Sequence, residues 1–186
     1  MKEVKFTQMK DGDKEDYNFL TKHEVEHTKG TANRLLKALV ELDQSLSGYK
    51  VTRLGHSLQS ATRAFHSGAD IDWIVSALLH DIGDIYAPYN HDEYAASIIR
   101  PFVREQCTWV VEKHGIFQML YYGEHVGSNP HKRENIENTY TFKIVQIFVS
   151  YGIKKVLIQI ITQNQLIFLP QWLKKFLPVN LMIRNI

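Results

Sequence analysis

The sequence predicts an all-α fold of about six to eight helices, because apolar residues recur at helical spacing and glycine or proline separates the periodic segments. The 186 residues suffice for one domain with a substantial core. A composition of 44% hydrophobic and 23% charged residues is typical of a soluble globular protein. No apolar stretch follows the N-terminus, so we expect neither a signal peptide nor a membrane span. The single cysteine, Cys107, fits a cytoplasmic protein with a buried thiol.

Residues 1–16 are polar and rich in aspartate and lysine, and we expect them to form a flexible lead-in. Helices are then predicted at residues 17–29, 31–46, 52–66, between Asp70 and Gly83, at 91–99 and at 104–114. Asp70 is the expected N-cap of the fourth helix, and Gly83 suits a left-handed cap after it. Pro101 stops the fifth helix and Gly115 is expected to cap the sixth.

The fourth helix is apolar, and it delivers a histidine and an aspartate, His80 and Asp81, side by side before it stops. Neighbouring helical positions point about 100° apart, so this pair can straddle one metal position or two. An isolated His-Asp pair is more often a buried ion pair beside a helix cap. The metal-binding interpretation therefore depends on ligands from other helices.

Three further histidines are expected at the ends or inner faces of successive helices, namely His56, His91 and His114. Imidazole groups and a carboxylate that can bridge suit zinc, manganese, nickel or iron. Two metal ions a few ångströms apart can share Asp81. The first ion would then take His56 and His80, and the second would take His91 and His114.

A second motif, HExxH at residues 23–27, matches the zinc-protease pattern in which two histidines bind zinc and the glutamate activates water. Charged residues flank it here, whereas the catalytic helix of such proteases is normally buried. The extended pattern also requires a third histidine where Asn33 stands. We interpret this motif as a solvated surface of histidine, glutamate and lysine side chains.

The sequence motifs around the candidate metal ligands resemble those of a known family. The segments HSLQ at residues 56–59 and ALLHDIG at residues 77–83 are similar to the HD-domain superfamily of helical metalloproteins, most of which are phosphohydrolases. The exact residues of these motifs resemble a narrower branch, the mixed-valence diiron oxygenases that cleave 1-hydroxy-2-aminoethylphosphonate-type compounds. These oxygenases are relatives of myo-inositol oxygenase. The resemblance covers residues 50–134 and implies an HD-domain helical bundle.

Carried over position by position, the resemblance implies that the iron ligands are His56, His80, Asp81, His91 and His114. Catalytic roles fall on Asp81, on Gln59, which would face the substrate, and in part on Tyr49, which stands near the expected gate. The remaining candidates for substrate binding are Gln59, Asp84, His125, Lys132 and Arg133, of which the last two belong to a small basic loop suited to an anion.

The implied reaction is the O2-dependent cleavage of the C–P bond of a small hydroxylated organophosphonate, which yields phosphate and a carboxylic acid. Its cofactor would be two iron ions in the mixed-valence Fe(II)/Fe(III) state. The expected partners are a small anionic substrate and O2; nucleic acid is not expected, because the basic residues are scattered, and the oligomeric state is left open. One alternative is a metal-dependent phosphohydrolase of a nucleotide or other phosphate ester, using manganese, nickel or zinc. Another is an inactive remnant that lacks the last metal ligand.

The chain departs from this branch at two places. The oxygenases have a tyrosine and a glutamate before the first histidine, where this chain has Leu46 and Tyr49. Both HD-type functions also require a late aspartate ligand, commonly after a tryptophan, yet the last aspartate is Asp92. Of the 22 lysine and arginine residues 6 follow Glu137, but none of the 20 acidic residues does.

We therefore divide the chain into an HD-type metal-binding domain at residues 1–144 and an atypical basic, acid-free tail at residues 145–186. One hypothesis for the tail is a shifted reading frame. If residues 148–153 are encoded as TTT GTG AGC TAT GGG ATC, reading from the third base gives Cys-Glu-Leu-Trp-Asp and restores a Trp-Asp pair. The competing hypothesis is a divergent C-terminus that packs normally, and sequencing the gene across codons 143–155 separates the two.

Overall fold

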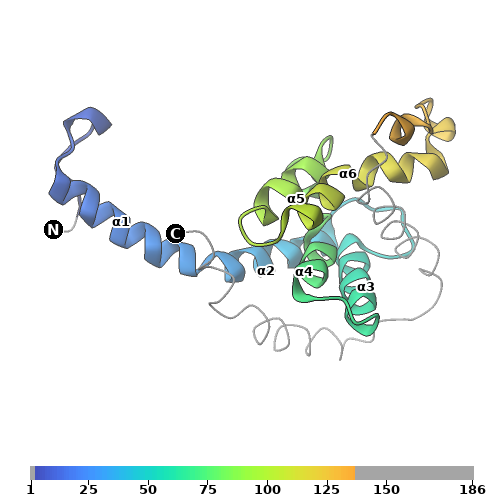
Figure 1. Cartoon of the computed structure of the whole chain (residues 1–186), viewed down its shortest axis with the longest axis horizontal. Coiled ribbons are helices and arrows are strands. Elements are labelled where there is room, and N and C mark those ends of the chain that lie inside the picture. Colours follow the sequence, from blue (N-terminus) through green and yellow to red (C-terminus); the bar gives the residue numbers. More distant parts are fainter. Residues whose placement is uncertain (1–2, 137–186) are drawn as a thin grey trace. The chain divides into compact units, whose positions relative to one another are not determined.

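The computed structural model describes residues 3–136, and all regular structure within this range is helical (Figure 1). The α-helices are α1 (Lys14–Lys29), α2 (Thr31–Glu41), α3 (Arg53–His66), α4 (Ile71–Leu79), α5 (His91–Ile99) and α6 (Glu105–Tyr122). The short 3-10 helices are η1 (Met9–Asp11), η2 (Leu42–Gln44), η3 (Ile82–Asp84), η4 (Glu124–Val126) and η5 (Lys132–Asn135). The predicted all-α fold is confirmed. The tail at residues 145–186 and its reading-frame hypothesis lie outside the described residues.

The chain divides between Lys37 and Ala38 into two compact units. In the first unit, α1 begins at Lys14, three residues before the predicted start. The reason is a capping box, in which Asp16 N donates to Asp13 Oδ1 at 2.9 Å and Asp13 N donates to Asp16 Oδ2 at 3.2 Å. The side chains of the HExxH motif at residues 23–27 are all exposed on α1, as expected for a solvated surface.

In the second unit, α4 is the central helix, packed against α3, α5 and α6. Residues 74–79 of α4 are all buried, which explains why this helix carries apolar residues around its whole circumference. The surrounding helices contribute the rest of the core, including Leu58, Ala61, Ala95, Ile99, Val110, Val111 and Phe117. The end of α4 therefore delivers His80 and Asp81 into the interior of the unit. None of the helices within residues 3–136 combines the length and apolar character needed to cross a membrane.

A polar contact fixes α4 against the start of α6. The carboxylate of Asp72, in the first turn of α4, accepts a hydrogen bond from the backbone N–H of Arg104 at 3.1 Å. The Arg104 guanidinium reaches Asp70, the N-cap of α4, at 2.7 Å. A carboxylate at a helix N-terminus satisfies an otherwise unpaired N–H and complements the helix dipole. The contact thus sets the position of α6, and with it His114, relative to the end of α4.

Two glycines play roles that the sequence did not predict. Gly83 is not a left-handed cap: it lies in η3, and a Cβ there would come within 2.5 Å of the backbone oxygen of His91. Gly115 does not end a helix, since α6 continues through it to Tyr122, and a Cβ there would lie 2.8 Å from Asp92 Oδ2. Both glycines are therefore sites of close approach between chain segments.

We expect Gly83→Ala to lower the free energy of unfolding by about 1–3 kcal/mol, because the new methyl group must displace the backbone at the start of α5. Urea unfolding of the two proteins measures this difference. Ser97→Ala, on the exposed face of the same α5, is the matched control and should change stability by less than about 0.5 kcal/mol. Equal stability of Gly83→Ala and the parent would show that His91 is not held by this contact.

The thiol of Cys107 is fully buried, and burial raises its pKa to about 12 despite the opposing charge of Arg104. We expect the folded protein to resist the thiol reagent DTNB at pH 8, and one thiol to react once urea unfolds it.

The pKa of Cys107 is raised in the folded state, so the unfolded chain loses the thiol proton at a lower pH. Stability should consequently fall by about 1.4 kcal/mol per pH unit above roughly pH 9, a slope that Cys107→Ala removes.

Candidate metal centre

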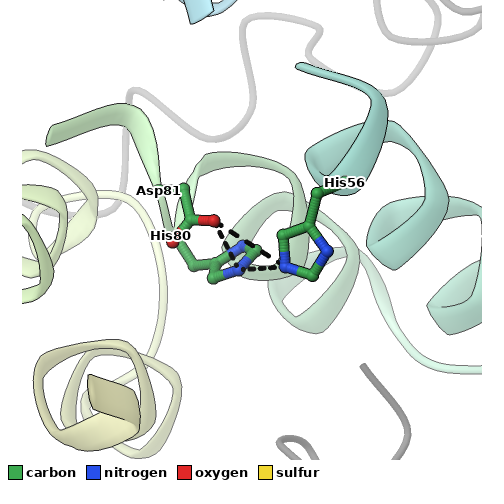
Figure 2. Close-up of side chains that lie close together, drawn as sticks. All are labelled: His56, His80 and Asp81. Atoms are coloured by element: carbon green, nitrogen blue, oxygen red, sulfur yellow. Dashed lines mark hydrogen bonds and ion pairs between the residues drawn. The ribbon is translucent and has the colours of Figure 1, made fainter. Parts of the chain in front are cut away.

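The first cluster of potential ligands joins α3 to the end of α4, and Figure 2 shows His56 turned toward the His80 and Asp81 pair. The Nε2 atoms of His56 and His80 lie 3.1 Å apart. Asp81 Oδ2 lies 3.3 Å from His80 Nε2 and 3.7 Å from His56 Nε2. Three ligand atoms thus converge on one point.

The second cluster is built on the other oxygen of the same carboxylate. Asp81 Oδ1 lies 3.4 Å from His114 Nε2, on α6, and 3.7 Å from His91 Nε2, at the start of α5. The two histidine nitrogens are 3.2 Å apart. In each cluster the ligand atoms all lie within 4.8 Å of one another, and Asp81 is the member that the two clusters share.

Backbone carbonyls fix the orientation of the two most buried histidines. His80 Nδ1 bonds to the carbonyl of Ala77 at 2.8 Å, and His114 Nδ1 bonds to the carbonyl of Val111 at 2.6 Å. Only a protonated Nδ1 can donate to a carbonyl, so in the neutral ring of either histidine Nε2 is the unprotonated nitrogen. Such outer partners orient metal-binding histidines in other proteins.

Burial and the shared carboxylate move the pKa values of this group in different directions. Burial lowers the pKa of His80 to about 3 and also lowers that of His56, so both rings are neutral at pH 7. Burial opposes ionisation of Asp81, but the surrounding histidines outweigh it and hold its pKa well below the usual value. For His114, contact with Asp81 outweighs burial and raises the pKa.

The residues present fit a pair of metal ions. No well-formed hydrogen bond reaches the buried Asp81 Oδ1, whose nearest histidine nitrogen is His114 Nε2 at 3.4 Å, and a bound cation would satisfy this oxygen better. Four imidazole nitrogens and one bridging carboxylate are donors that iron, manganese, nickel and zinc accept. Each ion would receive two histidines and one carboxylate oxygen from residues 3–136, which leaves coordination positions for other ligands.

A family comparison agrees with this geometry. The model of the HD domain matches residues 53–145, half of the chain. The chain belongs to the HD domain family. HD domains are metal-dependent enzymes of the phosphohydrolase type, so the His-Asp cluster of this HD domain is a candidate divalent metal site. No curated protein matches the chain.

The structure brings the five predicted ligands of the HD domain together, and it places the other predicted residues at different distances from them. Gln59 follows His56 by three residues on α3, and its Oε1 is buried without a hydrogen-bond partner. Asp84 lies close to the second cluster, with Oδ1 3.6 Å from His91 Nδ1. Tyr49 is 65% exposed, and its ring stacks against the Arg53 guanidinium, 5.0 Å away.

The predicted residues of the later segments lie apart from this network of contacts. His125 is exposed in η4, Lys132 is exposed in η5, and Arg133 is half-buried there. Within residues 3–136 none of the three forms an ion pair or hydrogen bond with the five clustered ligands. Their role in substrate binding stays a prediction.

Arg53 is the site residue that the sequence analysis missed. Its Nη1 lies 3.4 Å from Asp81 Oδ2 and its Nε lies 2.6 Å from Asp84 Oδ2. The signal was present, because Arg53 precedes His56 by three residues and so shares its helical face. An arginine in the first turn of a helix is ordinarily a surface residue, and for that reason its position in the sequence did not mark it.

Proposed function

We propose that this HD domain is a dinuclear iron oxygenase that cleaves the C–P bond of a small hydroxylated organophosphonate. The observation that carries the proposal is the division of Asp81 between two histidine pairs. Its Oδ2 faces His56 and His80, and its Oδ1 faces His91 and His114. A single metal ion would leave one of these pairs without a function, whereas two ions use all five side chains.

The overall reaction balances with O2 as the only co-reactant. A 1-hydroxyalkylphosphonic acid and one O2 contain the same atoms as one carboxylic acid and one phosphoric acid. The bonds broken are C–P, C–H and O–O, and the carbon is oxidised while both oxygen atoms are reduced. Bound iron would supply the binding and reduction of O2 together with chelation of the substrate's hydroxyl and phosphonate oxygens.

The chain's own residues suit the remaining tasks. Arg53 places a positive charge beside Asp81, which favours entry of an anionic substrate into a site that holds two carboxylates. The buried, unpaired Oε1 of Gln59 is an acceptor available to a substrate hydroxyl group. Asp81 remains ionised because its pKa is held low, so it can bridge two cations at any physiological pH.

A phosphohydrolase is the second candidate, and membership of the HD domain family favours it. The same five side chains would then hold two divalent ions that activate a water molecule against a phosphate ester. Arg53 would attract the anionic phosphate group of the substrate, as it would a phosphonate group. The two functions differ in the requirement for O2 and in the kind of bond broken at phosphorus.

The test is phosphate release from 2-amino-1-hydroxyethylphosphonate by the iron-loaded protein, with and without O2. The oxygenase should release phosphate only with O2 and should consume one O2 per phosphate. A hydrolase should leave this compound intact but release phosphate from a nucleotide or a simple phosphate ester without O2. Protein grown with added iron that retains no stoichiometric metal would indicate an inactive remnant. Asp81→Asn is the negative control in each assay.

A further inference from the structure

His91 differs from His80 and His114 in the group that its Nδ1 atom faces. The Nδ1 atoms of His80 and His114 bond to backbone carbonyls at 2.8 and 2.6 Å. The Nδ1 of His91 instead faces a carboxylate, with Asp84 Oδ1 3.6 Å away. This contact is longer than a direct hydrogen bond, but a charge at this distance still attracts the ring N–H in a buried setting.

The Asp84 side chain is held in place from its other end. Its Oδ2 forms an ion pair with Arg53 Nε at 2.6 Å, and only 7% of the side chain is exposed. Arg53 is itself fixed, because its Nη1 reaches Asp81 Oδ2 at 3.4 Å and its guanidinium stacks on the Tyr49 ring. Asp84 therefore connects α3 to the first residue of α5.

The backbone contributes a third contact between the same two segments. Gly83, the neighbour of Asp84 in η3, approaches the backbone of His91 so closely that a Cβ would lie 2.8 Å from its Cα. The turn that follows Asp81 thus touches both the backbone and the ring of His91. A ligand at the start of a helix, in the half-buried state of His91, needs such contacts to keep one orientation.

We propose that Asp84 is a positioning residue for the metal centre, whose carboxylate holds the His91 ring with Nδ1 protonated and Nε2 directed at the second metal position. Arg53 compensates the charge of Asp84 and keeps it from turning away. This role differs from the substrate contact expected from the sequence, because one Asp84 oxygen faces Arg53 and the other faces His91. The inference rests on the dinuclear centre of the proposed function.

The contact between Asp84 and His91 affects the affinity of the centre for the second metal ion. A carboxylate partner on the outer nitrogen makes an imidazole a stronger electron donor than a carbonyl partner does. Without it, the His91 ring is free to rotate or to take the other tautomer, in which Nε2 carries a proton and cannot bind metal. Loss of such an outer partner typically lowers metal affinity by about 10- to 100-fold.

The first experiment is a Co2+ titration of the metal-free protein and its variants, followed by visible absorption. Asp84→Asn should weaken the second equivalent of Co2+ by about 10- to 100-fold and leave the first equivalent unchanged. Glu93→Gln removes a charge from the same first turn of α5, but its side chain is exposed, so both equivalents should bind as in the parent. An Asp84→Asn variant that binds both equivalents with parental affinity overturns the proposal.

The second experiment needs neither metal nor variant. Nitrogen NMR of the metal-free protein labelled with 15N-histidine reports the tautomer of each ring, and His91 should carry its proton on Nδ1. A proton on Nε2 of His91 in the parent protein would overturn the proposal even if Asp84→Asn failed to fold. A parent that binds fewer than two Co2+ ions would instead contradict the dinuclear function, while the NMR result would still decide the role of Asp84.

Discussion

Asp81→Asn should abolish the binding of both metal ions and not of one. The substitution preserves the shape of the side chain but removes the charge that both histidine pairs share, and it replaces one acceptor oxygen with an NH2 group. Loss of an outer partner already costs about 10- to 100-fold in metal affinity, so loss of a bridging ligand should exceed about 100-fold at each position.

The measurement is metal content after dialysis, together with thermal unfolding with and without added metal. Metal should raise the unfolding temperature of the parent and leave that of Asp81→Asn unchanged, because only an ion that binds the folded state stabilises it. Asp72→Asn is the matched control, since Asp72 is a buried carboxylate in the first turn of α4 that contacts Arg104 and none of the five candidate ligands. Retention of one full equivalent by Asp81→Asn would show that the two positions do not depend on a shared bridge.

His56→Ala and His114→Ala should differ from Asp81→Asn and from each other. Each removes a ligand from a single cluster, so each variant should keep one equivalent of metal. His114 is the more buried of the two, with 1% of its side chain exposed against 18% for His56, and its removal also leaves a cavity beside Asp81. We expect His114→Ala to unfold at lower urea concentration than His56→Ala, by about 1–3 kcal/mol in free energy of unfolding.

The convergence of the five candidate ligands was predictable because each of them stands at a position that helix periodicity and end signals mark. His80 and Asp81 follow an apolar helix with an aspartate cap, and the predicted bounds of the helix that begins with His91 coincide with those of α5. The pattern alone indicated that these side chains face inward. Two metal positions followed from their number and chemistry.

The contacts that hold the ligands were not predictable in the same way. Gly83 and Gly115 each permit a close approach by a segment that is distant in the sequence or on another helix. In a sequence, a glycine is equally compatible with a turn, so this role could not be told from the residue alone. The length of α6 was underestimated because a single glycine costs a helix only about 1 kcal/mol, which buried side chains such as Phe117 offset. Arg53 and Asp84 show the same limit, since their pairing exists only once α3 and η3 are packed together.

The two metal positions should respond differently to acid. Burial lowers the pKa of His80 to about 3 and also lowers that of His56, so protons compete less with metal at the first position than at the second. Contact with Asp81 raises the pKa of His114 above its ordinary value, so a proton occupies Nε2 over part of this range. Metal at the second position must displace that proton, and its affinity should fall by roughly tenfold per pH unit below the raised pKa.

The stability of the metal-free protein depends on pH in the opposite direction to the metal affinity. Because the pKa of His114 is raised in the folded state, its charged contact with Asp81 stabilises the fold at low pH and is lost as the pH rises through the raised value. Protonation of His114 therefore stabilises the metal-free fold and, through the same proton, weakens metal binding at the second position. Mn2+ titrations at pH 5.5, 6.5 and 7.5 should show one equivalent whose affinity changes little and a second equivalent whose affinity falls toward pH 5.5. Parallel weakening of both equivalents would contradict the assignment of the proton to His114. It would indicate instead that the competing proton binds Asp81, which both ions share.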